Sequence, residues 1–127
     1  MDILLDTHAL LWFLKGDGKM PHKTRDIICK PENEKYVSVA SLWEVAIKFS
    51  GGKLELDGGI EGLIDAVEDN GFILLEIEPC HIKTVADLPF IHRDPFDRML
   101  IAQAIVEDMS IMTVDENILK YDVNVVW

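Results

Sequence analysis

Cysteine and histidine are scarce in this chain of 127 residues, which contains two cysteines and four histidines. Cys29 and Cys80 form no C-x-x-C pair, and no histidine lies at zinc-finger spacing from either of them. Structural zinc sites usually draw their ligands from such pairs. The sequence therefore argues against a structural zinc domain, and both cysteines are expected to be ordinary thiols in a reducing compartment.

Long hydrophobic runs are absent as well. No apolar stretch approaches the roughly 20 residues that a membrane-spanning helix requires. The first residues place acids at Asp2 and Asp6 on either side of an apolar stretch, unlike the basic start and apolar run of a secretory signal. We therefore expect a cytoplasmic protein with no membrane segment.

Basic residues are outnumbered by acids, because 12 Lys and Arg against 23 Asp and Glu give a formal net charge of -11 at pH 7. This excess argues against nucleic-acid binding through lysine and arginine contacts alone. The objection weakens if several acids share one pocket, because divalent cations held there would reverse the local charge. The remaining acids would keep the rest of the surface from binding polyanions indiscriminately.

The chain is rich in hydrophobic sequence arranged in short periodic segments. Hydrophobic residues make up 49% and charged residues 28% of it, as in ordinary globular proteins. We expect a single domain spanning residues 1–127, a length that suits one hydrophobic core. Strands are expected at residues 2–5, 36–39, 72–77, 110–114 and 123–126, and helices at 7–14, 23–30, 41–50, 59–69, 79–87 and 94–106, with a helical turn at 117–121.

Strands and helices alternate along the chain, and this order predicts an α/β fold. The short apolar strands suit a mostly parallel sheet of about four to five strands, covered by helices on both faces in three layers. In such sheets the ligand site lies at the carboxyl ends of the strands. Ser41, with Glu44 three residues later, has the pattern of a capping box, which predicts that the third helix begins at Ser41.

Four acids fall at one end of this predicted sheet. Asp6 directly follows the first strand, and Asp115 directly follows the fourth. Glu44 lies in the first turn of the third helix, and Asp97 opens the last long helix. Carboxylates that meet in a partly dry cleft repel one another unless a cation compensates them. Ligands made only of carboxylate oxygen favour Mg²⁺ or Mn²⁺, and such ions promote phosphodiester hydrolysis.

Each of these acids also has a purely structural explanation. Glu44 could complete the capping box, and Asp97 could complement the dipole of its helix. Asp6 and Asp115 could be turn residues that end strands. The joint placement of all four at one edge of the sheet favours a common site.

Four segments of the sequence resemble, in order, the signature blocks of PIN domains. The likeness is closest to the VapC-type toxins of bacterial and archaeal toxin–antitoxin pairs. The segments are LLDTH at 4–8, SLWEVAIK at 41–48, RDPFDRMLIAQA at 93–104 and TVD at 113–115. Any one of them occurs by chance, but four in the same order, spread over nearly the whole chain, indicate the family.

The resemblance implies a PIN-like fold and a metal-dependent endoribonuclease that is commonly a homodimer and is inhibited by a cognate antitoxin. Thr113 matches the family's hydroxyl residue that steadies the acidic cluster. Asp94 is either a supporting acid or the N-cap of a helix that starts at Pro95. The residues that would be catalytic and would hold Mg²⁺ or Mn²⁺ are Asp6, Glu44, Asp97 and Asp115.

Three cations close to these acids in sequence are candidates for contacting RNA phosphates, namely Lys48, Arg93 and Arg98. Cations near helix ends are, however, more often solvated or paired with neighbouring acids. Nothing in the sequence shows recognition of a 2′-hydroxyl, so the preference for RNA over DNA rests on the resemblance alone.

Two other functions fit part of the pattern. Mg²⁺-dependent phosphatases and receiver-like phosphoacceptors also gather acids at strand ends, but they need a phosphate-binding lysine after a late strand. Lys120 does not meet this need, because it belongs to a short helical turn beyond Asp115. A non-catalytic module whose acids bind a basic partner peptide would need no metal and would tolerate Asp6→Asn.

Overall fold

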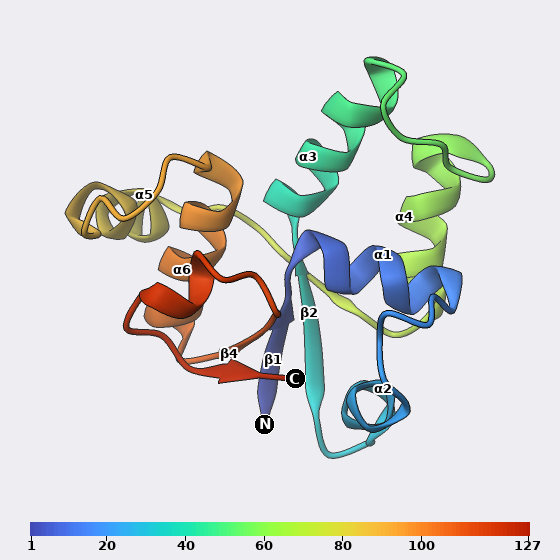
Figure 1. Ribbon diagram of the computed structural model, residues 1–127, viewed down its shortest axis with the longest axis horizontal. Coiled ribbons are helices and arrows are strands. Elements are labelled where there is room, and N and C mark those ends of the chain that lie inside the picture. The colour runs from blue at the N-terminus through green and yellow to red at the C-terminus, as the bar shows by residue number, and fades with distance from the viewer.

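The computed structural model describes residues 1–127, and Figure 1 shows a central sheet between two groups of helices. The strands are β1 (Asp2–Leu5), β2 (Glu34–Ser38), β3 (Ile73–Leu75), β4 (Ser110–Met112) and β5 (Val125–Val126). The helices are α1 (Thr7–Lys15), α2 (His22–Cys29), α3 (Val39–Ser50), α4 (Gly59–Asp69), α5 (Pro79–Asp87) and α6 (Pro95–Glu107), with one 3₁₀ turn, η1 (Ile118–Lys120). None of these helices combines the length and the apolar character needed to cross a membrane.

The sheet has five parallel strands in the order β3-β2-β1-β4-β5. β1 is central, because Ile3 pairs with Lys35 of β2 on one side and with Ser110 of β4 on the other. The strand order therefore reverses at β1, and parallel sheets form a crevice outside the carboxyl ends of the strands at such a reversal. The predicted parallel α/β sheet is confirmed.

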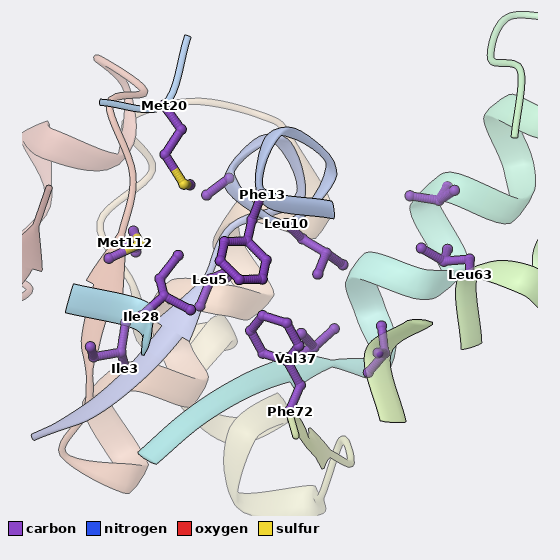
Figure 2. Close-up of a cluster of buried hydrophobic side chains, with 13 residues drawn as sticks. Ile3, Leu5, Leu10, Phe13, Met20, Ile28, Val37, Leu63, Phe72 and Met112 are labelled. Atoms are coloured by element: carbon purple, nitrogen blue, oxygen red, sulfur yellow. The ribbon is translucent and has the colours of Figure 1, made fainter. Parts of the chain in front are cut away.

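Alternating side chains of β1 fill the two sides of the sheet. Ile3 and Leu5 belong to a core shared with α1, α2, α3 and α4, and Figure 2 shows its side chains. Leu4 belongs to a second core, formed with α6 and β4. All three side chains are fully buried, and each such burial stabilises the fold by about 1.5–3 kcal/mol. The predicted three-layer arrangement is confirmed.

The third helix begins earlier than the sequence suggested, and the prediction of a capping box at Ser41 is wrong. The N-cap is Ser38, whose hydroxyl accepts a hydrogen bond from the backbone N–H of Ala40 at 3.0 Å. Ser38 ends β2 with the extended backbone that an N-cap requires. Ser41 and Glu44 consequently lie inside α3, where both are buried next to Thr7 at the start of α1.

The fourth strand ends at Met112 and does not reach Val114 as expected. The backbone turns away after Met112, and the Thr113 hydroxyl accepts a hydrogen bond from the backbone N–H of Asp115 at 2.9 Å. This local bond forms just beyond the last pairing of the strand, in which the Thr113 N–H donates to the carbonyl of Val126 at 3.4 Å. The carboxyl end of β4 is thereby shaped as a polar turn next to the end of β1.

Candidate functional site

Asp6 lies where β1 ends and α1 begins, beside the end of β4. Its backbone N–H donates to the carbonyl of Met112 at 3.1 Å, which continues the pairing of the two strands. One carboxylate oxygen, Oδ1, accepts from the backbone N–H of Ala9 at 2.7 Å and so caps α1. The other, Oδ2, accepts from the hydroxyl of Thr113 at 2.5 Å. Asp6 is thus both a helix cap and a member of a polar cluster.

The Thr113 hydroxyl joins Asp6 to Asp115, because it donates to the Asp6 carboxylate and accepts from the Asp115 backbone. The Asp115 carboxylate accepts through Oδ1 from the backbone N–H groups of Asn117 and Ile118, at 2.8 and 3.3 Å. Its Oδ2 has no hydrogen-bond partner within the protein. The turn after β4 therefore holds one oxygen of Asp115 and leaves the second available to a ligand.

Glu44 reaches the same region from α3. Its Oε1 accepts from the Thr7 hydroxyl at 2.7 Å, and Thr7 is the residue after Asp6. Its Oε2 pairs with Lys48 Nζ, one helical turn further on, at 3.0 Å. The hydroxyls of Thr7 and Ser41 lie 3.1 Å apart and complete a buried polar contact between α1 and α3. The sequence analysis assigned a role at the site to Glu44 but none to Thr7, and it interpreted Ser41 only as a helix cap.

Asp97 lies in the first turn of α6, which Asp94 caps. The Asp94 Oδ1 accepts from the backbone N–H groups of Phe96 and Asp97, at 2.9 and 3.1 Å, and Pro95 occupies the first helical turn. Of the two roles considered for Asp94, the structure therefore shows the N-cap. The Asp97 Oδ2 lies 3.1 Å from Nε2 of His92, a contact that the sequence did not suggest.

The pKa values of two of these acids are raised, mainly by burial and in smaller part by neighbouring negative charge. Burial raises the pKa of Asp6, hydrogen bonds from Thr113 and Ala9 oppose the rise, and the charge of Asp115 adds to it. Burial also raises the pKa of Asp97 to about 6, and the charges of Asp94 and Asp115 contribute. Asp115, after the end of β4, therefore lies within electrostatic reach of both Asp6 at the end of β1 and Asp97 at the start of α6.

The donor set fits a hard divalent cation. It consists of carboxylate oxygens only, it is partly desolvated, and it carries mutual repulsion that a cation would relieve. Glu44 accepts a hydrogen bond from Thr7, the residue after Asp6, and its other oxygen is paired with Lys48. The charge of Asp115 thus reaches both Asp6 and Asp97, and Glu44 is bonded to Thr7, the neighbour of Asp6. The carboxylates of these four acids do not form a group with donor atoms within 4.8 Å of one another, so a shared ion would have to draw them closer together.

The three predicted phosphate-binding cations lie in different environments. Arg93 is exposed, and Lys48 is partly exposed but paired with Glu44. Arg98 requires a correction, because it is only 7% exposed and does not face solvent. Its guanidinium donates to the carbonyls of Val85 and Pro89 and to the Tyr121 hydroxyl, at 3.3, 3.0 and 2.9 Å. Arg98 therefore holds the fold together and is not free for a phosphate.

A second group of side chains has the composition of a metal site, and it lies between α5 and α6. The donor atoms of Glu78, Cys80, His81 and Glu107 all lie within 4.8 Å of one another. His81 is fully buried, its Nδ1 accepts from the backbone N–H of Glu78, and its Nε2 lies 2.9 Å from a Glu107 oxygen. The ring proton must then be on Nε2, which leaves neither ring nitrogen a lone pair for a metal. These contacts explain His81 as a structural link between the two helices.

This explanation predicts a metal-independent stability effect. His81→Leu keeps the volume but removes both hydrogen bonds, so the free energy of unfolding should fall by about 2 kcal/mol. Urea denaturation in EDTA and in excess Zn²⁺ would measure it. A stabilisation by Zn²⁺ that the wild type shows and the variant lacks would instead indicate a metal site.

Comparisons with known proteins agree with the fold. A family model described as PIN domain matches residues 3–124, whereas no curated protein sequence matches significantly. The structure of VapBC2 from Rickettsia felis, bound to a promoter DNA fragment, is similar with a TM-score of 0.75 and 12% identity, covering 100% of this chain and 98% of that one. The structure of VapBC-1 from nontypeable Haemophilus influenzae is similar with a TM-score of 0.73 and 14% identity, covering 99% of this chain and 97% of that one. The structure of DNA-bound VapBC from Salmonella typhimurium is similar with a TM-score of 0.70 and 15% identity, covering 100% of this chain and 97% of that one.

Proposed function

Because the chain belongs to the PIN-domain family and has the fold of VapC-type nucleases, we propose that it is a metal-dependent endoribonuclease, the toxin of a toxin–antitoxin pair. The observation that carries this proposal is that Asp6, Asp97 and Asp115 come from separate elements and that the charge of Asp115 raises the pKa of both Asp6 and Asp97. A cation shared by these acids would relieve the cost of burying their charges close to one another.

In this proposal Asp6, Glu44, Asp97 and Asp115 hold Mg²⁺ or Mn²⁺. When bound, such ions supply Lewis-acid activation of water and stabilise the charge that develops on a phosphodiester. The residues of the chain position this chemistry. The cap of α1 fixes one oxygen of Asp6, and the turn that leads into η1 fixes one oxygen of Asp115. The bond between Asp94 and the Asp97 backbone fixes the start of α6.

Three further residues have proposed supporting roles. Thr113 keeps Asp6 and Asp115 in register through its two hydrogen bonds. Arg93, which is exposed next to the N-cap of α6, would contact an RNA phosphate. Lys48 would do the same once a metal ion takes over part of the Glu44 carboxylate, because the two positive charges compete for that group.

We propose two partners besides RNA, in the cytoplasm. The first is a cognate antitoxin, supported by the fact that the similar structures are toxin–antitoxin complexes. An antitoxin that inserts a lysine or arginine among the acids would compensate them as Lys48 compensates Glu44. The second is another copy of the chain, supported by large exposed apolar side chains such as Trp43 and Phe90, which are 61% and 73% exposed.

The test is cleavage of total RNA and of length-matched single-stranded DNA by antitoxin-free protein, in Mn²⁺, Mg²⁺ or EDTA. We expect cuts at discrete RNA positions that need the metal and that disappear in Asp6→Asn. Equal cleavage of the DNA would overturn the substrate assignment, and activity in EDTA would overturn the metal dependence. An inactive protein that also binds no Mn²⁺ would favour the acidic interaction module.

A further inference from the structure

A chain of buried and partly buried hydrogen bonds leads from the interior to Asp97. Arg98 Nη1 donates to the Tyr121 hydroxyl at 2.9 Å, and this hydroxyl lies 2.8 Å from Nδ1 of His92. Nε2 of His92 lies 3.1 Å from the Asp97 Oδ2. Arg98 and Tyr121 are only 7% and 6% exposed. The His92 side chain is 11% exposed and that of Asp97 19%, so the chain runs from buried residues toward the surface.

The direction of these bonds follows from counting hydrogens. The Tyr121 hydroxyl also accepts from the backbone N–H of His92 at 3.3 Å, so both of its lone pairs are used by Arg98 and by that N–H. Its single hydrogen then has one remaining partner, Nδ1 of His92, which must be the unprotonated ring nitrogen. The ring proton is consequently on Nε2 and points at Asp97. Arg98 is the residue that fixes this polarity, because a guanidinium can only donate.

The consequence is a defined orientation of the Asp97 carboxylate. Oδ2 is engaged by His92, whereas Oδ1 accepts no hydrogen bond from the protein and remains available to a ligand. Without this bond, repulsion from Asp94 and Asp115 would favour rotation of the carboxylate away from the cluster. A neutral N–H donor can hold an anionic ligand in place without competing with the metal for charge.

We propose that His92 is a positioning residue for Asp97, held in its Nε2–H tautomer by Tyr121 and Arg98, and that it sets the affinity of the acidic site for divalent metal. This inference rests on the proposed function, because it takes Asp97 as a metal ligand. Removing a group that orients a metal ligand typically weakens metal binding by about 10- to 100-fold.

Two substitutions separate the bond to Asp97 from the bond to Tyr121. His92→Gln places an amide N–H near the Nε2 position and should keep the donor to Asp97. His92→Asn places its amide near the Nδ1 position, so it keeps a partner for Tyr121 but loses the donor to Asp97. We expect the Kd for Mn²⁺, measured by calorimetry, to rise by about 10- to 100-fold in His92→Asn and only a few-fold in His92→Gln.

The controls locate the effect. Asp6→Asn should abolish Mn²⁺ binding, which shows that calorimetry reports on the acidic site, and the melting temperatures of both His92 variants in EDTA show whether the fold survives. Equal Kd values in His92→Asn and His92→Gln would overturn the inference, whether both match the wild type or both are weakened. A wild type that binds no Mn²⁺ at all would remove the proposed metal site as well.

A measurement without metal tests the tautomer independently. In metal-free protein labelled with ¹⁵N-histidine, the His92 ring should show a protonated Nε2 and an unprotonated Nδ1. Tyr121→Phe should shift this equilibrium and weaken Mn²⁺ binding, while Arg98 keeps its two carbonyl partners. Protonation of Nδ1 in the wild type would overturn the inference even if metal and RNA cleavage behave as proposed, and this readout decides the matter if His92→Asn does not fold.

Discussion

Asp97→Asn is expected to abolish RNA cleavage and at the same time to stabilise the metal-free protein at pH 7. The substitution removes a metal ligand, and losing several kcal/mol of transition-state stabilisation corresponds to on the order of a thousandfold in rate or more. It also removes a buried charge, because burial and the neighbouring acids hold the pKa of Asp97 at about 6. The gain in the free energy of unfolding should reach up to about 3 kcal/mol.

The shape of the side chain supports both halves of this expectation. An asparagine at position 97 can turn its amide oxygen to His92 and keep that hydrogen bond, and the backbone bond from residue 97 to Asp94 is unaffected. Asp6→Asn should be inactive too, but without a clear gain in stability. Asp6 accepts through both oxygens, and an amide nitrogen facing the Thr113 hydroxyl would break one of these bonds.

The measurement pairs cleavage assays in Mn²⁺ with urea denaturation in EDTA at pH 7. Glu116→Gln is a matched control, because Glu116 is exposed next to Asp115 and accepts no hydrogen bond. It should change neither activity nor stability. If Asp97→Asn still cuts RNA at the wild-type sites, Asp97 is not a catalytic residue. If Asp97→Asn is inactive because it is unfolded, the charge of Asp97 does not destabilise the folded protein as we propose.

The sequence predicted the fold well because its signals are local and repeated. The apolar run at 2–5 and the alternation of strands with helices require only neighbouring residues, and both were confirmed. The start of α3 was predicted at the wrong serine because Ser38 and Ser41 are both good N-caps by type. The choice of Ser38 depends on where β2 ends, and that is set by pairing with β1 and β3.

The acids of the site could be predicted, but the groups that hold them could not. Asp6 and Asp115 follow strands, and a parallel sheet brings the ends of its strands together. The bond from His92 to Tyr121 joins residues 29 positions apart, and the bond from Thr113 to Asp6 spans 107. Hydrogen bonds of this range leave no periodic trace in the sequence. Only the resemblance pointed to Thr113, and nothing pointed to Tyr121.

Structural and functional explanations of the acids also turn out to be compatible. Asp115 accepts from the turn that leads into η1, as its structural explanation proposed, whereas Asp6 caps α1 and is more than a turn residue that ends a strand. In Asp115 capping occupies one oxygen and leaves the other without a partner in the protein. The hydrogen bonds to one oxygen thus fix the orientation of the carboxylate and leave the other oxygen available to a metal ion. An acid at the start of a helix can therefore still be a metal ligand.

Without metal, the protein should become less stable as the pH rises from about 4 to 7, the reverse of the usual behaviour of paired carboxylates. The folded-state pKa of Asp97 is about 6, above its ordinary value of 3.8, and the pKa of Asp6 is raised too. Between these values the folded state binds more protons than the unfolded state. Raising the pH therefore lowers the free energy of unfolding, by up to about 3 kcal/mol for Asp97 alone.

The contribution of Asp97 is isolated by comparing two proteins. Urea denaturation of the wild type and of Asp97→Asn, in EDTA at half-unit steps from pH 4 to 7.5, gives two stability profiles. Groups that titrate equally in both proteins cancel in the difference between their free energies of unfolding. This difference should grow in favour of the variant as the pH rises from 3.8 to about 6, and then level off. Parallel profiles would mean that Asp97 is not under the strain that burial and its neighbours impose.

Bound metal should reverse this pH dependence, because it binds the folded protein with Asp6 and Asp97 ionised, the form that is least stable without metal. At pH 7, Mn²⁺ at about 100 times its Kd should raise the free energy of unfolding by about 2.7 kcal/mol, provided that the unfolded chain binds none. Below pH 6, protons compete for Asp97 and Asp6, so the same concentration should stabilise less. A stabilisation by Mn²⁺ that persists unchanged at pH 5, or in Asp97→Asn, would place the ion away from these acids. If the stabilisation by Mn²⁺ is lost both at pH 5 and in Asp97→Asn, the same carboxylates bind the metal and repel one another in its absence.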